Sequence, residues 1–347
     1  MPACGRRSKR AGAYNRHMTE SLHPFARLTP DFLLDAVESV GVRASGSLMA
    51  LGSYENRVYQ VGLDDEPPLV AKFYRPGRWR REAILEEHAF SLELADAEIP
   101  VVPPLVFGGH TLFEHDGFLF SLFARRGGRP PELDNEDVLE WLGRFLGRIH
   151  ALGACRRYQA RGTLDAASFG DAAVTTVLES GLLPAELVEP WQVVARQCVD
   201  AVRAAYARAG DVRLIRVHGD CHAGNLMWTD AGPHFVDLDD SRMAPAMQDI
   251  WMLLSGSRSE QQAQLAAVLA GYEDFAEFDE RELHLIEALR TLRLIHYSAW
   301  LAARVDDPAF GSAFPWFGTQ RYWEEQVLTL REQLGALSEP PLWGGNH

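Results

Sequence analysis

Lysine, cysteine and long hydrophobic runs are scarce in this chain of 347 residues. No stretch of 18 apolar residues occurs, so the sequence predicts no membrane-spanning helix. Only four cysteines are present, Cys4, Cys155, Cys198 and Cys221, and none forms a C-x-x-C pair. This usage is typical of a reduced, cytoplasmic protein and excludes a small fold held together by disulfides.

Positive charge is also in short supply. The chain has 34 Lys and Arg against 48 Asp and Glu, a formal net charge of −14. A field of that sign repels nucleic acids and anionic lipid surfaces, so we predict neither a nucleic-acid nor a membrane partner. The one basic run, over residues 6–16, lacks the apolar core of a secretory signal. We interpret residues 1–20 as a disordered basic extension.

The scarcity of lysine points to one position. Of the 34 basic residues, 32 are arginine, and only Lys9 and Lys72 are lysine. A lysine ammonium is a compact point charge, whereas a guanidinium is a planar fork. The single lysine outside the basic extension therefore suggests a role for Lys72 that arginine cannot perform, with chance as the alternative explanation.

The hydrophobic pattern divides the chain into two parts. The first alternates helical spacing with strand-like runs, over residues 31–40, 47–63, 68–75, 81–97 and 105–124. Gly, Pro and Arg then dominate residues 124–133, which marks a boundary. The second part has mainly helical spacing, over residues 138–150, 185–208, 246–254, 260–275, 281–304 and 319–336, with a β-rich insertion over 214–240.

The β-rich insertion contains three polar side chains with informative spacing. Its two short strands are expected to bring Asp220, Asn225 and Asp237 to the same end of a hairpin. Carboxylate and amide oxygens are the ligands that Mg²⁺ uses together with substrate phosphates. The step from Asp220 to Asn225 equals that of the kinase catalytic loop H-R-D-x-x-x-x-N, and Asp237 takes the place of the Asp of D-F-G. The alternative interpretation is ordinary turn and capping chemistry.

The first part of the chain supplies the complementary features. Val70-Ala71-Lys72 resembles the kinase V-A-I-K strand, and Glu87 on the next helix is placed to pair with Lys72, with Glu86 as the alternative. Residues 51–56 occupy the place of the Gly-rich phosphate loop but contain one glycine, so backbone amides and the Ser53 hydroxyl would replace the missing close approach. No G-K-[ST] sequence occurs, which excludes a Walker A loop.

These motifs resemble those of a known group of enzymes. HGDxHxxN at residues 218–225 followed by V-D-x-D-D at 236–240 is similar to the aminoglycoside phosphotransferase and choline kinase branch of the kinase-like fold. More narrowly, the strings LGSYENRVYQV, VAKFYRPGRW, ILEEH and FVDLDDSRMAPAMQDIWMLL resemble the stress response kinase A family of bacterial serine/threonine protein kinases. The resemblance covers about residues 22–343.

The resemblance implies a bilobal α+β fold, with a nucleotide-binding N-terminal lobe over residues 21–125 and a larger, mostly helical catalytic lobe over 126–347. It further implies catalytic roles for Asp220, as the proton acceptor, and for Asp237. Asn225 and Asp237 would hold Mg²⁺, Lys72 and Ser53 would contact the ATP phosphates, and Glu87 would orient Lys72. Asp249 would anchor the backbone of the catalytic loop.

The implied reaction is the Mg²⁺-dependent transfer of the ATP γ-phosphoryl group to a Ser or Thr of a protein, including the kinase itself, in a bacterial stress response. We expect a cytoplasmic monomer. One alternative is a small-molecule kinase of the same fold, acting on choline, homoserine or an aminoglycoside. Another is a nucleotide-binding regulator without turnover, which the complete Lys, Asp, Asn and Asp set disfavours.

Other residues have simpler interpretations. A zinc site at His218, Cys221, His222 and His234 lacks regular ligand spacing, and His218 is expected to buttress the loop instead. Three polar residues of one helix either line a substrate cleft or pair with acids: Arg290, Arg293 and His296. A set of aromatic residues is expected to pack between helices rather than to bind a cation: Trp300, Phe314, Trp316, Trp323 and Trp343.

Overall fold

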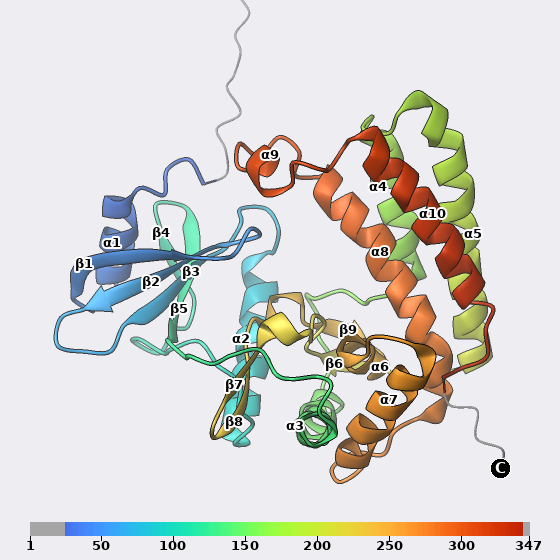
Figure 1. The fold of residues 1–347 in the computed structure, drawn as a ribbon. Coiled ribbons are helices and arrows are strands. Elements are labelled where there is room, and N and C mark those ends of the chain that lie inside the picture. Colours follow the sequence, from blue (N-terminus) through green and yellow to red (C-terminus); the bar gives the residue numbers. More distant parts are fainter. Residues whose placement is uncertain (1–24, 343–347) are drawn as a thin grey trace, which may run out of the picture.

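An antiparallel sheet forms the centre of the N-terminal lobe in the computed structural model, which describes residues 25–342. Its strands lie in the order β1-β2-β3-β5-β4. They are β1 (Ala44–Leu51), β2 (Arg57–Leu63), β3 (Leu69–Phe73), β4 (Phe113–His115) and β5 (Phe118–Ala124). Helix α1 (Pro30–Glu38) packs on the sheet, and α2 (Arg81–Asp96) lies between the sheet and the helical lobe (Figure 1). Residues 1–20, predicted to be a disordered extension, lie outside the described part.

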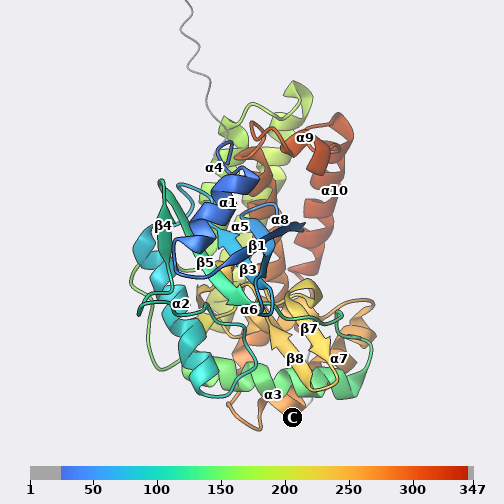
Figure 2. The ribbon, with the colours of Figure 1, turned by 90° about the vertical axis from the view of Figure 1, so that its left-hand side faces the viewer.

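Local sequence signals account for the placement of α1. Its N-terminus follows Thr29, whose hydroxyl accepts a hydrogen bond from the backbone N–H of Phe32 at 3.3 Å. Leu33, Ala36 and Val37 recur at helical spacing and are buried with apolar residues of the central strands. Seen from the sheet side, the helix lies across these strands (Figure 2). The amphipathic pattern of α1 therefore closes one face of the sheet.

Strand β3 holds Lys72 in the middle of the sheet. Lys72 is paired with Val58 of β2 on one side and with Ser121 of β5 on the other. Side chains alternate between the two faces of a strand, so the neighbours Ala71 and Phe73 enter the apolar core while Lys72 points to the opposite face. A central strand paired on both edges is a rigid support for this side chain.

The C-terminal lobe is mostly helical (Figure 1). Its longer helices are α3 (Glu136–Gly153), α4 (Ala172–Glu179), α5 (Ala185–Ala209), α7 (Arg258–Tyr272), α8 (Ile286–Ala302) and α10 (Gln320–Ala336). Two short ones are α6 (Met247–Ile250) and α9 (Phe310–Ala313). Helices α3 and α7 approach closely because Gly143 has no side chain at their contact. A Cβ at this position would lie only 2.0 Å from the carbonyl oxygen of Val268. The fully buried Trp191 and Trp323 fill the space between α5 and α10.

Four short strands follow α5 along the chain and precede or flank the turn into α6. Strand β6 (Ile215–Val217) pairs with β9 (Arg242–Ala244), and β7 (Leu226–Thr229) pairs with β8 (Gly232–Phe235), both antiparallel. The β7–β8 hairpin also forms two bridges to other parts of the chain: Trp228 pairs with Arg129 in the connection between the lobes, and Phe235 pairs with Val101 in the segment between α2 and β4. The hairpin is therefore fixed relative to both lobes.

The predicted α+β, two-lobed kinase-like class is confirmed, with local differences. The strand run predicted over 47–63, with an interruption at Gly52, is divided there into β1 and β2. The helix predicted over 246–254 is split into α6 and a 3₁₀ turn at Trp251–Leu253. The helical segment from Ala166–Asp171 through α4 was not predicted, because α4 is short and its β-branched Val and Thr residues weaken the helical signal. Across residues 25–342, no helix is long and apolar enough to cross a bilayer.

Candidate active site

The β7–β8 hairpin brings two of the predicted site residues together. Asn225 directly precedes β7 and Asp237 follows β8 by two residues. The backbone N–H of Val236 donates to the carbonyl oxygen of Asn225 at 3.0 Å, which extends the pairing to the open end of the hairpin. Asp237 then turns the chain with φ 61° and ψ 63°, a left-handed conformation that aspartate tolerates better than most residues. The amide and the carboxylate thus meet at this end.

The loop before the hairpin is anchored by a buried aspartate. Asp249 of α6 is 0% exposed and accepts hydrogen bonds from the backbone N–H groups of His218, at 2.7 Å, and Gly219, at 2.8 Å. His150 of α3 lies 3.0 Å from the same carboxylate. The His218 ring, through Nε2, contacts the carbonyl oxygen of Val236 at 2.9 Å. The predicted anchoring role of Asp249 and buttressing role of His218 are confirmed.

Gly219 is required by the geometry of this loop. Its φ of 88° lies in the left-handed region, and a Cβ would lie 2.3 Å from the carbonyl oxygen of Asp240. A protein-kinase arginine therefore does not fit at this position. The close approach sets the backbone direction immediately before Asp220.

Asp220 is held by three side chains. Its Oδ1 accepts a hydrogen bond from Arg293 Nη1 at 2.5 Å, while Oδ2 lies 3.3 Å from Asn225 Nδ2 and 3.4 Å from His222 Nε2. Burial disfavours ionisation, but the hydrogen bond from His222 and the charge of Arg293 outweigh it and hold the pKa of Asp220 below its usual value. Asp220 is therefore a carboxylate at neutral pH, ready to accept a hydrogen bond from a hydroxyl group.

Lys72 reaches across from the sheet to the end of the hairpin. Its Nζ lies 2.6 Å from Asp237 Oδ1 and 3.4 Å from Asp239 Oδ1, and the residue is only 6% exposed. Burial disfavours the ammonium, but Asp237 and Asp239 outweigh it and raise the pKa of Lys72 above its ordinary value. The one lysine of the described chain is thus a charged group at the junction of the lobes.

Neither candidate glutamate is within 4 Å of Lys72, which corrects the predicted Lys72–Glu87 ion pair. Two aspartates take up the lysine charge, and Glu87 Oε2 instead lies 3.8 Å from Arg161 Nη2. Burial raises the pKa of Glu87 to about 7, against the lowering effect of Lys72 and Arg161. Glu86 accepts hydrogen bonds from the backbone N–H groups of residues 159–161, so it holds that segment against α2.

The one-glycine loop at residues 52–56 is positioned by contacts with the helical lobe. Glu55 Oε2 accepts hydrogen bonds from Trp300 Nε1 and Arg304 Nε, each at 2.7 Å. The Tyr54 ring packs edge-on against Phe314, with ring centroids 4.8 Å apart. Ser53, the predicted phosphate contact, is half-buried in this loop. Contacts from α8 and the segment after it therefore hold the loop where a kinase would use glycine flexibility.

Asp239 is the centre of a second connection between the lobes. Its carboxylate is buried, pairs with Lys72 and Arg78, and accepts a hydrogen bond from Asn56 Nδ2 at 3.1 Å. Burial disfavours ionisation, but Arg78 and Lys72 hold the pKa of Asp239 below its usual value. The side-chain partners of this carboxylate, Lys72, Arg78 and Asn56, all belong to the sheet lobe.

Sequence spacing gave no sign of Glu55, Asn56 or Arg78 as parts of the site, and it left Asp239 open between a supporting role beside the site and the start of a helix. Their partners are far along the chain, as in the pair of Glu55 with Arg304, so no local motif records the contact. The available signal was compositional: a Glu-Asn pair three residues after the single glycine, and an acidic D-x-D-D run. These residues connect the lobes rather than matching a catalytic motif.

The remaining predicted residues have separate positions. Burial raises the pKa of the Cys221 thiol. His222 Nδ1 accepts a hydrogen bond from the backbone N–H of Gly224 at 2.9 Å. Within residues 25–342, no group of three His, Cys, Asp or Glu side chains is arranged to hold a metal ion. Arg290 pairs with Glu287, whereas Arg293 reaches Asp220, so only one of these arginines lines the site.

The aromatic residues of the helical lobe also divide into different roles. His296 stacks on Phe169 with centroids 3.9 Å apart. Trp323 is fully buried, as predicted, whereas Trp316 is 42% exposed and packs at a tilt against Tyr322, with ring centroids 5.3 Å apart. Trp300 binds Glu55 through its indole N–H, in addition to packing. Trp343 lies outside the described residues.

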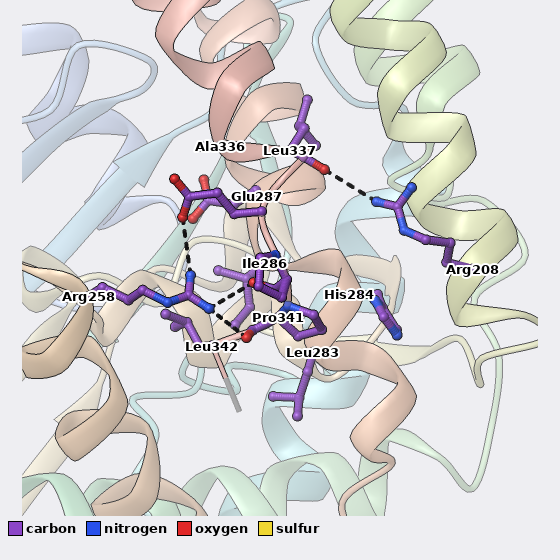
Figure 3. Close-up of a pocket in the computed structure, with 12 residues that line it drawn as sticks. Arg208, Arg258, Leu283, His284, Ile286, Glu287, Ala336, Leu337, Pro341 and Leu342 are labelled. Carbon is purple, nitrogen blue, oxygen red and sulfur yellow. Dashed lines mark hydrogen bonds and ion pairs between the residues drawn. The ribbon is translucent and has the colours of Figure 1, made fainter. Parts of the chain in front are cut away.

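A separate small pocket lies at the far end of the helical lobe (Figure 3). It is formed by the start of α8, the end of α10 and residues 339–342, and Arg258 Nη2 donates to the carbonyl oxygens of Pro340, at 2.8 Å, and Pro341, at 2.6 Å. Its volume of about 40 Å³ is suited to water rather than a substrate. It is lined by none of the residues that surround Lys72.

A sheet lobe and a helical lobe that meet at Lys72, Asp220, Asn225 and Asp237 define a kinase-like phosphotransferase. Residues 48–286 match the model of the phosphotransferase enzyme family. Two solved structures share the fold. One is an amicoumacin kinase in complex with AMP-PNP, Ca²⁺ and Ami, with a TM-score of 0.71 and 18% sequence identity; the match covers 91% of this chain and 95% of that one. The other is a microcompartment-associated aminopropanol kinase, with a TM-score of 0.68 and 16% sequence identity; the match covers 90% of this chain and 99% of that one.

Sequence comparison identifies the branch. The chain is 44% identical over 325 residues to stress response kinase A of Escherichia coli O157:H7, which covers 94% of this chain and 98% of the relative. It is 42% identical, with the same coverage, to the serine/threonine protein kinase RdoA of Salmonella typhimurium strain LT2. The chain therefore belongs to the phosphotransferase enzyme family and, within it, to the stress response kinase A family. The family predicted from the motifs is confirmed.

Proposed function

We propose that this kinase transfers the γ-phosphoryl group of ATP, with Mg²⁺, to a serine or threonine hydroxyl of a protein. The observation that carries the proposal is the convergence of Lys72 Nζ and Asp237 Oδ1, 2.6 Å apart, next to the hairpin end where Asn225 contacts Asp220. Four side chains from distant parts of the sequence thereby supply a cation, a base and two oxygen ligands. This is the residue set that phosphoryl transfer requires.

The donor set fits a divalent cation. The Asn225 side-chain amide donates hydrogen bonds through Nδ2 to Asp220. The Oδ1 atom of Asn225 therefore points away from Asp220, and no donor within residues 25–342 contacts this oxygen. The side chain of Asp237 is 47% exposed, so its carboxylate is accessible as well as paired with Lys72. Hard oxygens of this kind suit Mg²⁺, which would neutralise charge on the phosphates when bound. Asn225 and Asp237 are the residues that would hold it.

The protein residues have defined parts in the reaction. Asp220 orients the acceptor hydroxyl and takes its proton as the new oxygen–phosphorus bond forms. The bond between the γ-phosphorus and the bridging oxygen breaks, and ADP leaves with that oxygen. Lys72 positions the phosphates, and Ser53 with the backbone amides of residues 52–56 covers them. The charge of the buried Glu87 adds to those of Asp237 and Asp239 in raising the pKa of Lys72.

A protein acceptor is supported by the names of the close relatives, one of which is called a serine/threonine protein kinase at 42% identity. The small-molecule kinases among the structural neighbours are only 16% and 18% identical, so they support the fold alone. A regulator without turnover is disfavoured because every element of the catalytic set is present. Autophosphorylation, a bacterial stress role, a cytoplasmic location and a monomeric state belong to the same proposal.

Transfer of labelled phosphate tests this function. The purified chain is incubated with γ-labelled ATP and Mg²⁺, alone, with a protein panel, and with choline, homoserine and an aminoglycoside. We expect label on protein Ser or Thr, and a loss of about 100-fold or more with Asp220→Asn. The matched control is Asp230→Asn, an exposed acid at the opposite end of the same hairpin. Label confined to a small alcohol, or full activity of Asp220→Asn, would contradict the proposal.

A further inference from the structure

An arginine lies directly against the proposed base. Arg293 on α8 donates from Nη1 to Asp220 Oδ1 at 2.5 Å, and its side chain is 44% exposed while that of Asp220 is 20% exposed. An acceptor hydroxyl must come within hydrogen-bond distance of Asp220 to transfer its proton. Any acceptor that does so is therefore placed beside the guanidinium of Arg293.

Arg293 differs from the other arginines of α8 and the segment after it. Arg290 is taken up by Glu287 at 2.6 Å and Gln261 at 3.2 Å, and Arg304 by Glu55. Within residues 25–342, Arg293 has Asp220 as its single carboxylate partner, so most of its five N–H donors have no protein acceptor. A half-exposed guanidinium with spare donors is a binding group for an anion.

The surface next to Arg293 is aromatic. Tyr297, one helical turn further along α8, is 43% exposed, and its ring stacks on that of Trp300 with centroids 5.8 Å apart and planes 10° apart. Rigid aromatic faces provide contact area for an extended chain at low conformational cost. Helix α8 therefore presents the Arg293 guanidinium beside Asp220 and, one turn further, the aromatic face of Tyr297 and Trp300.

We propose that Arg293 selects acceptor segments in which the Ser or Thr is flanked by acidic residues. This inference rests on the proposed function and names the charge of its substrate. A carboxylate beside the acceptor hydroxyl would bind the guanidinium fork and draw it from Asp220, which leaves Oδ1 free to take the hydroxyl proton. A basic segment would be repelled by Arg293 and would leave the Arg293–Asp220 pair in place.

The acidic net charge of −14 does not oppose this selection at contact distance. At physiological ionic strength, charges on the surface are screened beyond about 8 Å. The local guanidinium therefore decides the preference near Asp220, while the overall field affects only the rate of encounter.

Matched peptides test the role of Arg293. Three Ser peptides of equal length carry Asp, Gln or Arg on both sides of the serine, and kcat/KM is measured for the wild-type chain, Arg293→Gln and Arg293→Glu. We expect the wild type to prefer the Asp peptide over the Arg peptide by about tenfold or more. We expect Arg293→Gln to bring the ratio near one and Arg293→Glu to reverse it, with KM for ATP unchanged. Arg290→Gln, with thermal unfolding as a folding control, should retain the wild-type ratio.

Small acceptors separate this inference from the proposed function. The same chains are assayed with a small hydroxy acid and an amino alcohol of similar size. Phosphorylation of these alcohols but of no peptide would overturn the protein-kinase function, and the preference between acid and amine would then decide the role of Arg293. A wild-type preference for the Arg peptide or for the amine, a ratio unaffected by Arg293→Gln, or no phosphorylation of any acceptor would overturn the inference.

Discussion

Two aspartates that share Lys72 are expected to respond in opposite ways to the same substitution. Asp239→Asn should chiefly reduce stability, whereas Asp237→Asn should chiefly reduce activity. The contrast follows from their surroundings, since the side chain of Asp239 is 4% exposed and that of Asp237 is 47% exposed. Both substitutions remove one charge and preserve the shape of the side chain.

The expected magnitudes come from the partners of each carboxylate. Asp239 is buried against Lys72, Arg78 and Asn56, and removing one member of a buried charged network costs about 3 to 5 kcal/mol of unfolding free energy. Within residues 25–342, Asp237 has Lys72 as its single ion-pair partner and is half in solvent. When Asp237 is neutralised, Lys72 keeps the buried carboxylate of Asp239 as a partner, so the loss of unfolding free energy should be smaller than for Asp239→Asn. Loss of the Asp237 ligand should instead lower kcat by about 100- to 1000-fold.

Urea unfolding followed by circular dichroism gives the first quantity, and labelled phosphate transfer gives the second. The expected result is a much larger fall in the urea midpoint for Asp239→Asn than for Asp237→Asn, and a large fall in kcat for Asp237→Asn. Equal destabilisation by the two substitutions, or a fully stable Asp239→Asn chain, would refute the assignment of one aspartate to the interlobe network and the other to the metal.

Four further substitutions test other parts of the structure. Glu55→Gln removes the charge that holds Arg304 against the phosphate loop, so we expect KM for ATP to rise about tenfold with a smaller change in kcat, and an unchanged KM would argue against the loop's role. Burial raises the pKa of Glu282 from 4.5 to about 7, so its stabilising contribution is complete below pH 4.5 and is lost as pH rises through 7. Glu282→Gln should therefore remove up to about 3 kcal/mol of pH dependence in urea unfolding between these values, and an unaltered pH profile would contradict this. Gly143→Ala would place a Cβ 2.0 Å from a carbonyl oxygen of α7 and should lower the thermal midpoint, whereas Gly335→Ala in α10, with no atom within 4 Å of the added Cβ, should raise it slightly; similar effects of the two would refute the packing argument.

The sequence was sufficient for the parts of the site that depend on short-range spacing. Asp220 and Asn225 lie five residues apart on one loop, and Asp237 follows the second strand of the hairpin, so alternation and turn signals place all three together. The rarity of lysine singled out Lys72 without any structural information. These features are local or compositional, and a single sequence records both.

Contacts between the lobes were beyond sequence reasoning. The pairing of Glu55 with Arg304 joins residues 249 positions apart, and no periodicity links them. The predicted Lys72–Glu87 pair was wrong for a related reason. A helical stripe shows which face Glu87 occupies, but it does not show that two aspartates of the other lobe lie nearer to the lysine. Which carboxylate binds a cation is decided by tertiary distances.

A crystal structure with a non-hydrolysable ATP analogue and Mn²⁺, located by its anomalous signal, would show where this protein binds the metal and the triphosphate. We predict the metal on Asn225 and Asp237, the triphosphate between Lys72 and the loop at residues 52–56, and the γ-phosphate facing Asp220. A nucleotide bound elsewhere, or a metal that does not contact Asn225 and Asp237, would contradict the account.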